Sequence, residues 1–174
     1  NSVLLDRNAV TYLEGHREIP CEEQGGIYFL NRNKLSLYKP DSNELTEVHQ
    51  FDNVQDVYVA NDRLYILDRS SNITIYNLLT QQEEKKLQYG DHASSIGADS
   101  KGRIYLAESN GNGDDYDLYL LSPEGTLLSQ ALSEEAVYGF CGFDESNGNY
   151  YVDTYNNWRY WGYDHDMHAL RAGN

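Results

Sequence analysis

The feature of the sequence that most constrains its fold is an internal repeat of about 40 residues. Each copy contains a short aromatic and aliphatic stretch that ends in a polar residue: Ile27–Asn31, Leu64–Asp68, Ile104–Glu108 and Tyr150–Asp153. Successive anchor tyrosines are 37, 40 and 46 residues apart; they are Tyr28, Tyr65, Tyr105 and Tyr151. The repeat predicts one structural unit that is used four times.

The residues around each anchor predict further strands and turns. Apolar and polar residues alternate in Leu35–Tyr38 and Ile73–Tyr76, a pattern typical of a strand with two different faces. Pro, Asp, Asn and Gly residues between the stretches indicate β-turns. An outer strand is expected after the last turn of each copy, near Leu45, Leu87, Leu128 and Leu170. Each copy is therefore predicted to be a four-stranded antiparallel sheet.

Four-stranded antiparallel units that recur every 40 residues are typical of β-propeller blades. One blade cannot bury both of its faces alone, and stacking against neighbours around an axis buries both. Residues Asp99–Glu108, followed by Ser122–Gly125, resemble a blade of the NHL, YWTD and gluconolactonase-like six-bladed propellers, a group that includes secreted bacterial propeller proteins. The resemblance covers about residues 20–171. We expect an all-β chain that forms a β-propeller or a propeller segment.

The repeat predicts four blades at about residues 20–50, 51–90, 91–132 and 133–174, with residues 1–19 as a partial blade or closing strands. Three interpretations of this number stay open. The chain is a segment of a larger propeller, a propeller that closes with four blades, or an open arc that assembles with further copies into a dimer or fibre. An open arc leaves an apolar blade face uncovered at each end, which favours a partner.

The charge of the chain argues against two classes of partner. Lys and Arg number 13 and Asp and Glu 28, so the formal net charge is −15. Phosphate backbones and anionic lipid surfaces repel such a chain, so we expect neither nucleic-acid binding nor membrane docking. The longest apolar stretches have about four residues, against the roughly 18 that a membrane helix needs. An acidic propeller of this kind is expected outside the cell or at the cell surface.

The densest group of candidate binding residues is aromatic and lies in the fourth copy. Planar rings beside amide side chains stack on sugars or anchor a protein partner. Packing of one blade against the next also needs large residues on both faces of a strand, and that interpretation stays open. The predicted patch comprises Tyr155, Asn157, Trp158, Tyr160 and Trp161.

An acidic insertion lengthens the third copy. Calcium prefers several oxygen ligands, and this loop offers five Asn or Asp side chains, although it lacks the closing Glu of an EF-hand. The loop is a candidate calcium site or a solvated hairpin loop, and no other cofactor is expected. Its residues are Asn110, Asn112, Asp114, Asp115 and Asp117. The stretch Asp164–His168 has the composition of a transition-metal site, but its position in the repeat predicts a plain turn.

Two further candidates concern covalent modification. Cys21 and Cys141 lie far apart and form no CxxC motif, so a disulfide and two unpaired thiols both stay open. Asn72 begins an Asn-Ile-Thr sequence and is a candidate glycosylation site.

Three functional classes follow. The first is a non-catalytic extracellular module that recognises a protein or a glycan. The second is a structural subunit that assembles through its open blade faces. The third follows from the family resemblance, which implies a metal-dependent lactonase-like hydrolase, with a ring of ligands from the ends of the anchor strands: Asn31, Asp68, Glu108 and Asp153. The sequence contains no nucleophile motif and no Gly-rich phosphate loop, which favours a non-catalytic role.

Overall fold

The computed structural model describes residues 17–21, 26–111, 115–155 and 165–171. In these residues the only regular elements are β-strands, as the sequence predicts. The described part accordingly holds no helix that is long and apolar enough to cross a membrane.

The strands form four antiparallel sheets, each built from strands consecutive in the chain. Sheet 1 contains β1 (Arg17–Cys21), β2 (Gly26–Asn31), β3 (Lys34–Lys39) and β4 (Glu44–Gln50). Sheet 2 contains β5 (Val54–Ala60), β6 (Arg63–Asp68), β7 (Asn72–Asn77) and β8 (Gln82–Gln88). Sheet 3 contains β9 (Ala93–Ala98), β10 (Ile104–Ser109), β11 (Tyr116–Leu121) and β12 (Leu127–Ser133). Sheet 4 contains β13 (Ala136–Asp144), β14 (Asn149–Tyr155) and β15 (His165–Arg171).

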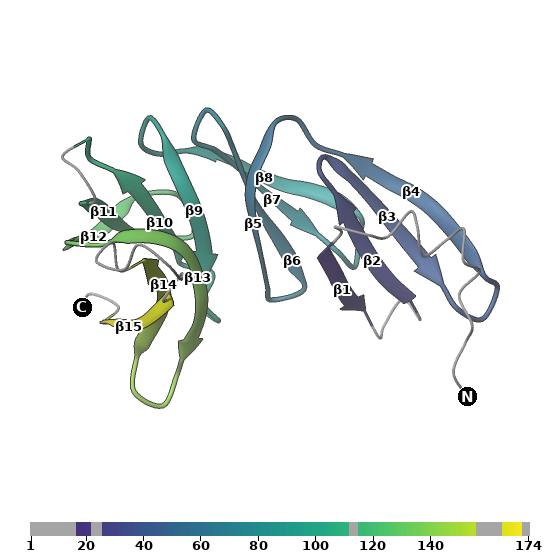
Figure 1. The fold of residues 1–174 in the computed structure, drawn as a ribbon. Coiled ribbons are helices and arrows are strands. Elements are labelled where there is room, and N and C mark those ends of the chain that lie inside the picture. The colour runs from purple at the N-terminus through teal and green to yellow at the C-terminus, as the bar shows by residue number, and fades with distance from the viewer. Residues whose placement is uncertain (1–16, 22–25, 112–114, 156–164, 172–174) are drawn as a thin grey trace, which may run out of the picture.

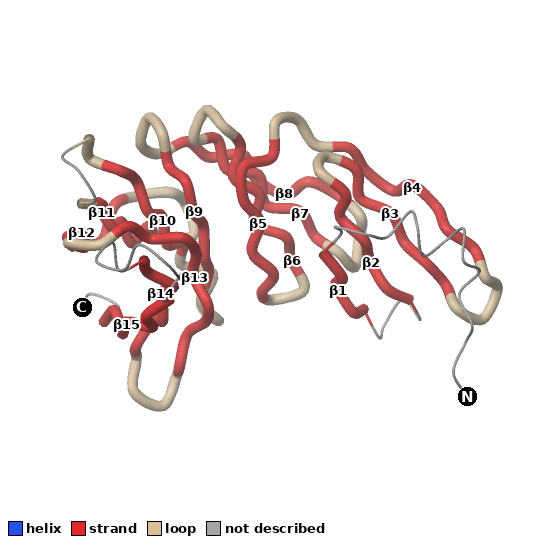
Figure 2. Tube along the Cα trace, viewed as in Figure 1, coloured by secondary structure: helices blue, strands red, loops and turns tan. Residues whose placement is uncertain are grey.

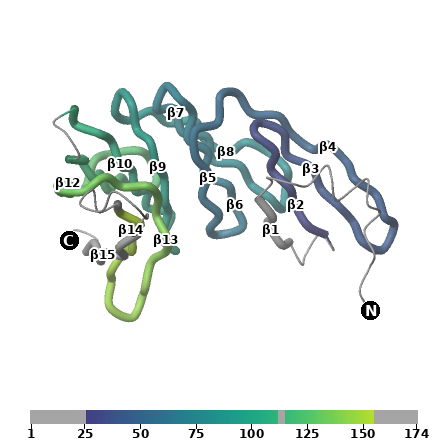
Figure 3. The backbone as a smooth tube through the Cα atoms, in the orientation of Figure 1, coloured from purple at the N-terminus to yellow at the C-terminus, as the bar shows by residue number. Residues whose placement is uncertain are grey.

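The sheets follow one another along an arc from β1–β4 at one end to β13–β15 at the other (Figure 1). In sheet 2 short loops join the consecutive strands, and the tube views show the same order of sheets along the chain (Figures 2 and 3). The first strands of successive sheets lie side by side, β5 against β9 and β9 against β13. This is the arrangement of propeller blades, in which the first strand of each blade lies nearest the axis.

A separate hydrophobic cluster fills each interface between neighbouring sheets. Tyr28 of sheet 1 lies in the cluster shared with sheet 2, Tyr65 of sheet 2 in the next, and Tyr105 of sheet 3 in the last. The anchor tyrosine of each of these sheets therefore points at the following sheet. In sheet 4 the buried ring is Tyr150, which faces sheet 3, so its neighbour Tyr151 points away and is only half-buried.

The outer strand expected near Leu87 in the second copy is β8, which pairs Leu87 with Ile73 and begins at Gln82. One expectation about the fourth copy is wrong. In the fourth copy Asp164–His168 was expected to form a turn, yet His165 and Asp166 lie in β15, which pairs with β14. Residues 156–164, between β14 and β15, lie outside the described residues.

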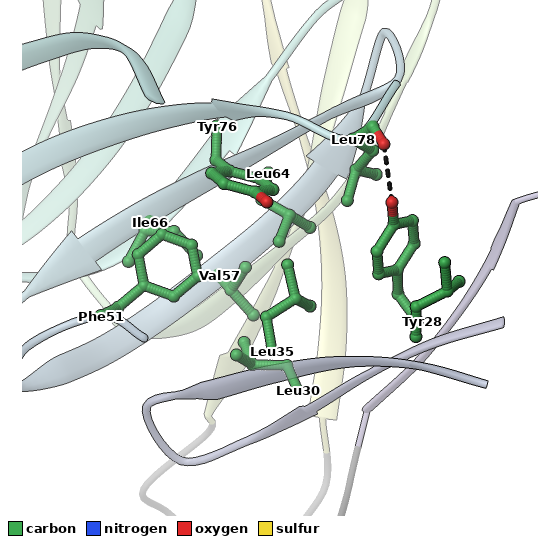
Figure 4. Packing of buried hydrophobic residues seen from close by; sticks show 10 residues of the cluster. Tyr28, Leu30, Leu35, Phe51, Val57, Leu64, Ile66, Tyr76 and Leu78 are labelled. Carbon is green, nitrogen blue, oxygen red and sulfur yellow. Dashed lines mark hydrogen bonds between the residues drawn. The ribbon is translucent and has the colours of Figure 1, made fainter. Parts of the chain in front are cut away.

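The two buried tyrosines between sheets 1 and 2 differ in how their hydroxyl groups are satisfied. The hydroxyl of Tyr28 donates to the carbonyl of Leu78 at 2.7 Å and so joins the two sheets (Figure 4). The hydroxyl of Tyr76 is equally buried and has no hydrogen-bond partner among the described residues. Burial is the main cause that raises the pKa of Tyr76 to about 12. A buried donor without a partner costs free energy, whereas a bonded one contributes it.

We therefore expect opposite results from removing these two hydroxyl groups. Tyr28→Phe should lower the free energy of unfolding by about 1 to 2 kcal/mol, because a buried hydrogen bond is lost. Tyr76→Phe should leave the free energy unchanged or raise it, because only an unsatisfied group is removed. Urea unfolding followed by tyrosine fluorescence measures both. A larger loss for Tyr76→Phe than for Tyr28→Phe would contradict this assignment.

A glycine in the innermost strand of sheet 3 allows sheets 3 and 4 to approach closely. A Cβ atom on Gly97 would lie 2.5 Å from the hydroxyl oxygen of Tyr150 and 2.7 Å from Cβ of Phe140. The same hydroxyl donates to the carbonyl of Ala98 at 3.0 Å, and burial is the main cause that raises the pKa of Tyr150 far above its usual value. The missing side chain thus makes room for the hydrogen bond that joins these sheets.

The Gly97→Ala variant should be destabilised by about 1 to 3 kcal/mol, because the added methyl group overlaps side chains that cannot both move. Gly139→Ala is the matched control, since a Cβ atom there would have no neighbour within 4 Å. Thermal unfolding followed by circular dichroism compares the two variants. Equal melting temperatures would show that the close approach of sheets 3 and 4 is not needed.

Candidate functional site

Most residues of the predicted aromatic patch lie outside the described residues. Tyr155 ends strand β14, and its side chain is outside the description. Asn157, Trp158, Tyr160 and Trp161 also lie outside the described residues. Their role in ligand binding or in blade packing therefore stays a prediction.

The acidic insertion is described at its two ends. The backbone N–H of Asn110 donates to the carbonyl of Asp115 at 3.2 Å, which closes a hairpin between β10 and β11. Asp117 is the second residue of β11, and its carboxylate accepts a hydrogen bond from Gln130 at 3.4 Å. Asn112 and Asp114 are outside the description, and in the described part of the chain no three His, Cys, Asp or Glu side chains form a metal-binding group. The calcium site stays a prediction.

Two members of the ring of residues that the lactonase resemblance implies take part in turns. An Oδ1 atom of Asp68 accepts the backbone N–H of Ser70 at 2.8 Å and that of Asn72 at 2.9 Å. Glu108 accepts the backbone N–H groups of Asp91 and His92 in the connection that follows β8. These carboxylates stabilise local backbone structure: both oxygen atoms of Asp68 and the Oε1 atom of Glu108 accept hydrogen bonds there.

The candidate modification sites are partly described. Cys141 lies on the exposed side of β13, and partial burial, with the nearby Asp153 charge, raises the pKa of its thiol. The side chain of Cys21 is outside the description, so the disulfide stays a prediction. Asn72 is exposed at the start of β7, and its side-chain amide donates to Asp68 at 2.9 Å.

Two clefts lie between neighbouring sheets and contain none of the predicted ligand-binding patch. The cleft beside sheets 1 and 2 has a volume of about 430 Å³, and its lining includes Phe51, Ile66 and Glu83. Glu83 pairs with His49 at 2.9 Å, and hydrogen bonds from His49 and then Lys86 are the main causes that lower the pKa of the carboxyl group. A second cleft of about 410 Å³ lies between sheets 2 and 3. Its lining includes Tyr65, Glu84 and Lys101.

The most distinctive surface of the described chain is the outer strand of sheet 3, which we call the β12 edge (Leu127–Ser133). Three of its seven residues are leucines whose exposed fractions are 40% at Leu127, 50% at Leu128 and 57% at Leu132. In solution such side chains favour contact with another apolar surface. Leu45 of β4 is similarly exposed, but its neighbours in the strand, Glu44 and Thr46, are polar.

The β12 edge is also an open strand edge. It pairs with β11 on one side, and among the described residues no strand pairs with its other side. A bulge sets Leu127 opposite Leu121 and Ser129 opposite Leu120, so Leu128 is an extra residue in the strand. Exposed edges in native sheets usually carry charged residues that discourage a further strand. The sequence of this edge, LLSQALS, contains none.

The sequence analysis did not predict this binding surface, although two features of the sequence indicate it. Leu45 and Leu128 were recognised as recurring apolar residues of outer strands, and both are about half exposed rather than buried. The absence of charge between Leu127 and Ser133 is the second signal. It separates this strand from its counterpart β8, whose sequence QEEKKLQ holds four charged residues.

Comparison with known proteins supports the fold. No protein-family model matches the sequence, and no curated protein sequence is significantly similar to it. Among solved structures, BamB from Moraxella catarrhalis superimposes with a TM-score of 0.55 at 10% identity, covering 78% of this chain and 39% of its own. The N-terminal domain of Nup159 gives 0.53 at 14% identity, with 86% and 43% covered. U3-55K gives 0.57 at 12% identity, with 83% and 48% covered.

These structural neighbours are β-propeller proteins. The chain spans less than half the length of each of them. The matches confirm the predicted fold class: the chain is an all-β protein with the fold of a β-propeller or of a propeller segment.

Proposed function

We propose that this chain is a protein-binding propeller module and that the β12 edge is one of its binding surfaces. The observation that carries the proposal is the exposure of Leu127, Leu128 and Leu132 on an uncharged, open strand edge. An edge of this kind offers both unpaired backbone groups and apolar side chains to an added strand. The propeller fold supports the proposal because it holds the edge of a blade rigid and accessible.

The proposal also includes the location of the protein and its ligand classes. We place the module outside the cell or at the cell surface, on its acidic charge and its resemblance to secreted bacterial propellers within the NHL, YWTD and gluconolactonase-like group. The lactonase-like alternative has weaker support, because Asp68 and Glu108 are engaged in turns. Lactone hydrolysis that is lost when a chelator is added would support the lactonase-like alternative.

The binding surface can be tested with a photo-crosslinking amino acid at single positions. Placed at Leu128 or Leu132 and activated in the source cells, it should form the same protein adduct from both positions. The adduct formed from position 128 should disappear when Leu132→Lys is added, because a charge on the edge opposes an incoming strand. Position Leu45 is the matched control, with an exposed fraction of 49% on the outer strand of sheet 1. Equal adducts at Leu45, or none at the β12 edge, would contradict the proposal.

Glycan recognition by the aromatic patch is a separate part of the proposal. Trp158→Ala and Trp161→Ala should each reduce retention on a glycan array several-fold, since a ring contact contributes about 0.5 to 1.5 kcal/mol beyond the area that it buries. Circular dichroism should show an unchanged fold. A variant that loses its fold would support the packing interpretation, and a variant that binds as well as the original chain would reject the glycan site.

A further inference from the structure

The charge of the chain restricts where two copies of it can meet. At a net charge of −15, two copies repel each other over most of their surfaces. Among the outer strands of the described sheets, β4 contains Glu44 and Glu47, β8 contains four charged residues, and β15 contains Asp166 and Arg171. Of these described outer strands, only the β12 edge has no charged side chain. It is therefore the outer strand at which a second copy meets the least electrostatic opposition.

The sequence of the β12 edge is complementary to itself in an antiparallel arrangement. With Gln130 at the centre, Leu128 of one copy lies opposite Leu132 of the other, and Ser129 lies opposite Ala131. The symmetry produces each of these pairs twice. Directly opposed side chains in antiparallel strands are in contact, and apolar pairs stabilise the strand pairing. The two Gln130 side chains meet at the centre; each amide donates one hydrogen to Asp117 of its own chain and keeps its second hydrogen and its oxygen for the other copy.

We propose that the β12 edge pairs with the β12 edge of a second copy of this chain, so that two copies of sheet 3 join into one continuous sheet. This inference rests on the proposed protein-binding function of the edge and names the partner. The contact uses the same residues on both copies, so it closes at two chains and does not propagate. It also covers the exposed leucines of both copies at once.

The mass in solution tests the pairing. Light scattering over a concentration range should give twice the mass of one chain at the upper end. Leu132→Lys and Leu128→Lys should each weaken the association by at least about tenfold, because each places two charges in the paired edge. Leu45→Lys, at a site of equal exposure on β4, should leave the mass unchanged. Added salt should strengthen the dimer, since it screens the repulsion between two acidic chains.

A cysteine at the centre of the edge tests the register. Opposed residues in antiparallel strands have Cα atoms about 4.5 to 5.5 Å apart, which suits a disulfide. Gln130→Cys should therefore form a covalent dimer under mild oxidation, with a peptide linking residue 130 to itself in the mass spectrum. Thr46→Cys, at an exposed position near the middle of β4, is the matched control and should form none.

The results distinguish failure of the self-pairing from failure of the proposed protein-binding function. A chain that stays monomeric, or a dimer that the β12 variants and Leu45→Lys affect equally, overturns the self-pairing. If the chain is monomeric while the photo-crosslinker at Leu128 and Leu132 captures one different protein, the edge binds a foreign strand, and only the self-pairing fails. If the chain is monomeric and neither position forms a specific adduct, the proposed function fails as well.

Discussion

The packing of one sheet face on the next is the interaction on which this structure depends. Each small sheet has two apolar faces, and neither can be buried inside the sheet itself. The three clusters between sheets supply that burial, and an anchor tyrosine contributes to each from the preceding sheet. Tyrosine suits this position because its ring fills the interface while its hydroxyl can reach a backbone group of the neighbouring sheet, as Tyr28 reaches Leu78.

The same packing explains which features could be predicted from the sequence. An anchor tyrosine must recur wherever a sheet needs a neighbour, so the second strand of every copy was identifiable. The turn expected at Asp164–His168 was wrong because its composition is typical of a turn, and only the pairing with β14 shows that His165–Arg171 forms a strand. Outer strands were also harder to predict. Most of their side chains are exposed, so packing against a neighbouring sheet does not fix which residues they contain. The repeat pattern is therefore weaker in the outer strands.

The candidate site was harder to predict from the sequence than the fold. Composition located aromatic and acidic groups within loops, but pattern alone could not establish their contacts. The carboxylates of Asp68 and Glu108 illustrate the difficulty, because a carboxylate that closes a turn and one that binds a metal look identical in a sequence. The β12 edge presents the opposite case. Its leucines fall in a predicted outer strand, but they resemble core residues in the sequence, and the structure shows that solvent reaches them.

The separation of the core into three clusters has a consequence for how the chain loses its structure. A sheet at either end of the described arc is held by one described interface, whereas sheets 2 and 3 are each held by two. Opening is then graded along the chain, and an end sheet can detach while the central pair keeps its amides protected from exchange. A further sheet, or a second copy, that covers the free face of an end sheet gives that sheet a second interface. A longer array of sheets is therefore more stable than a shorter one.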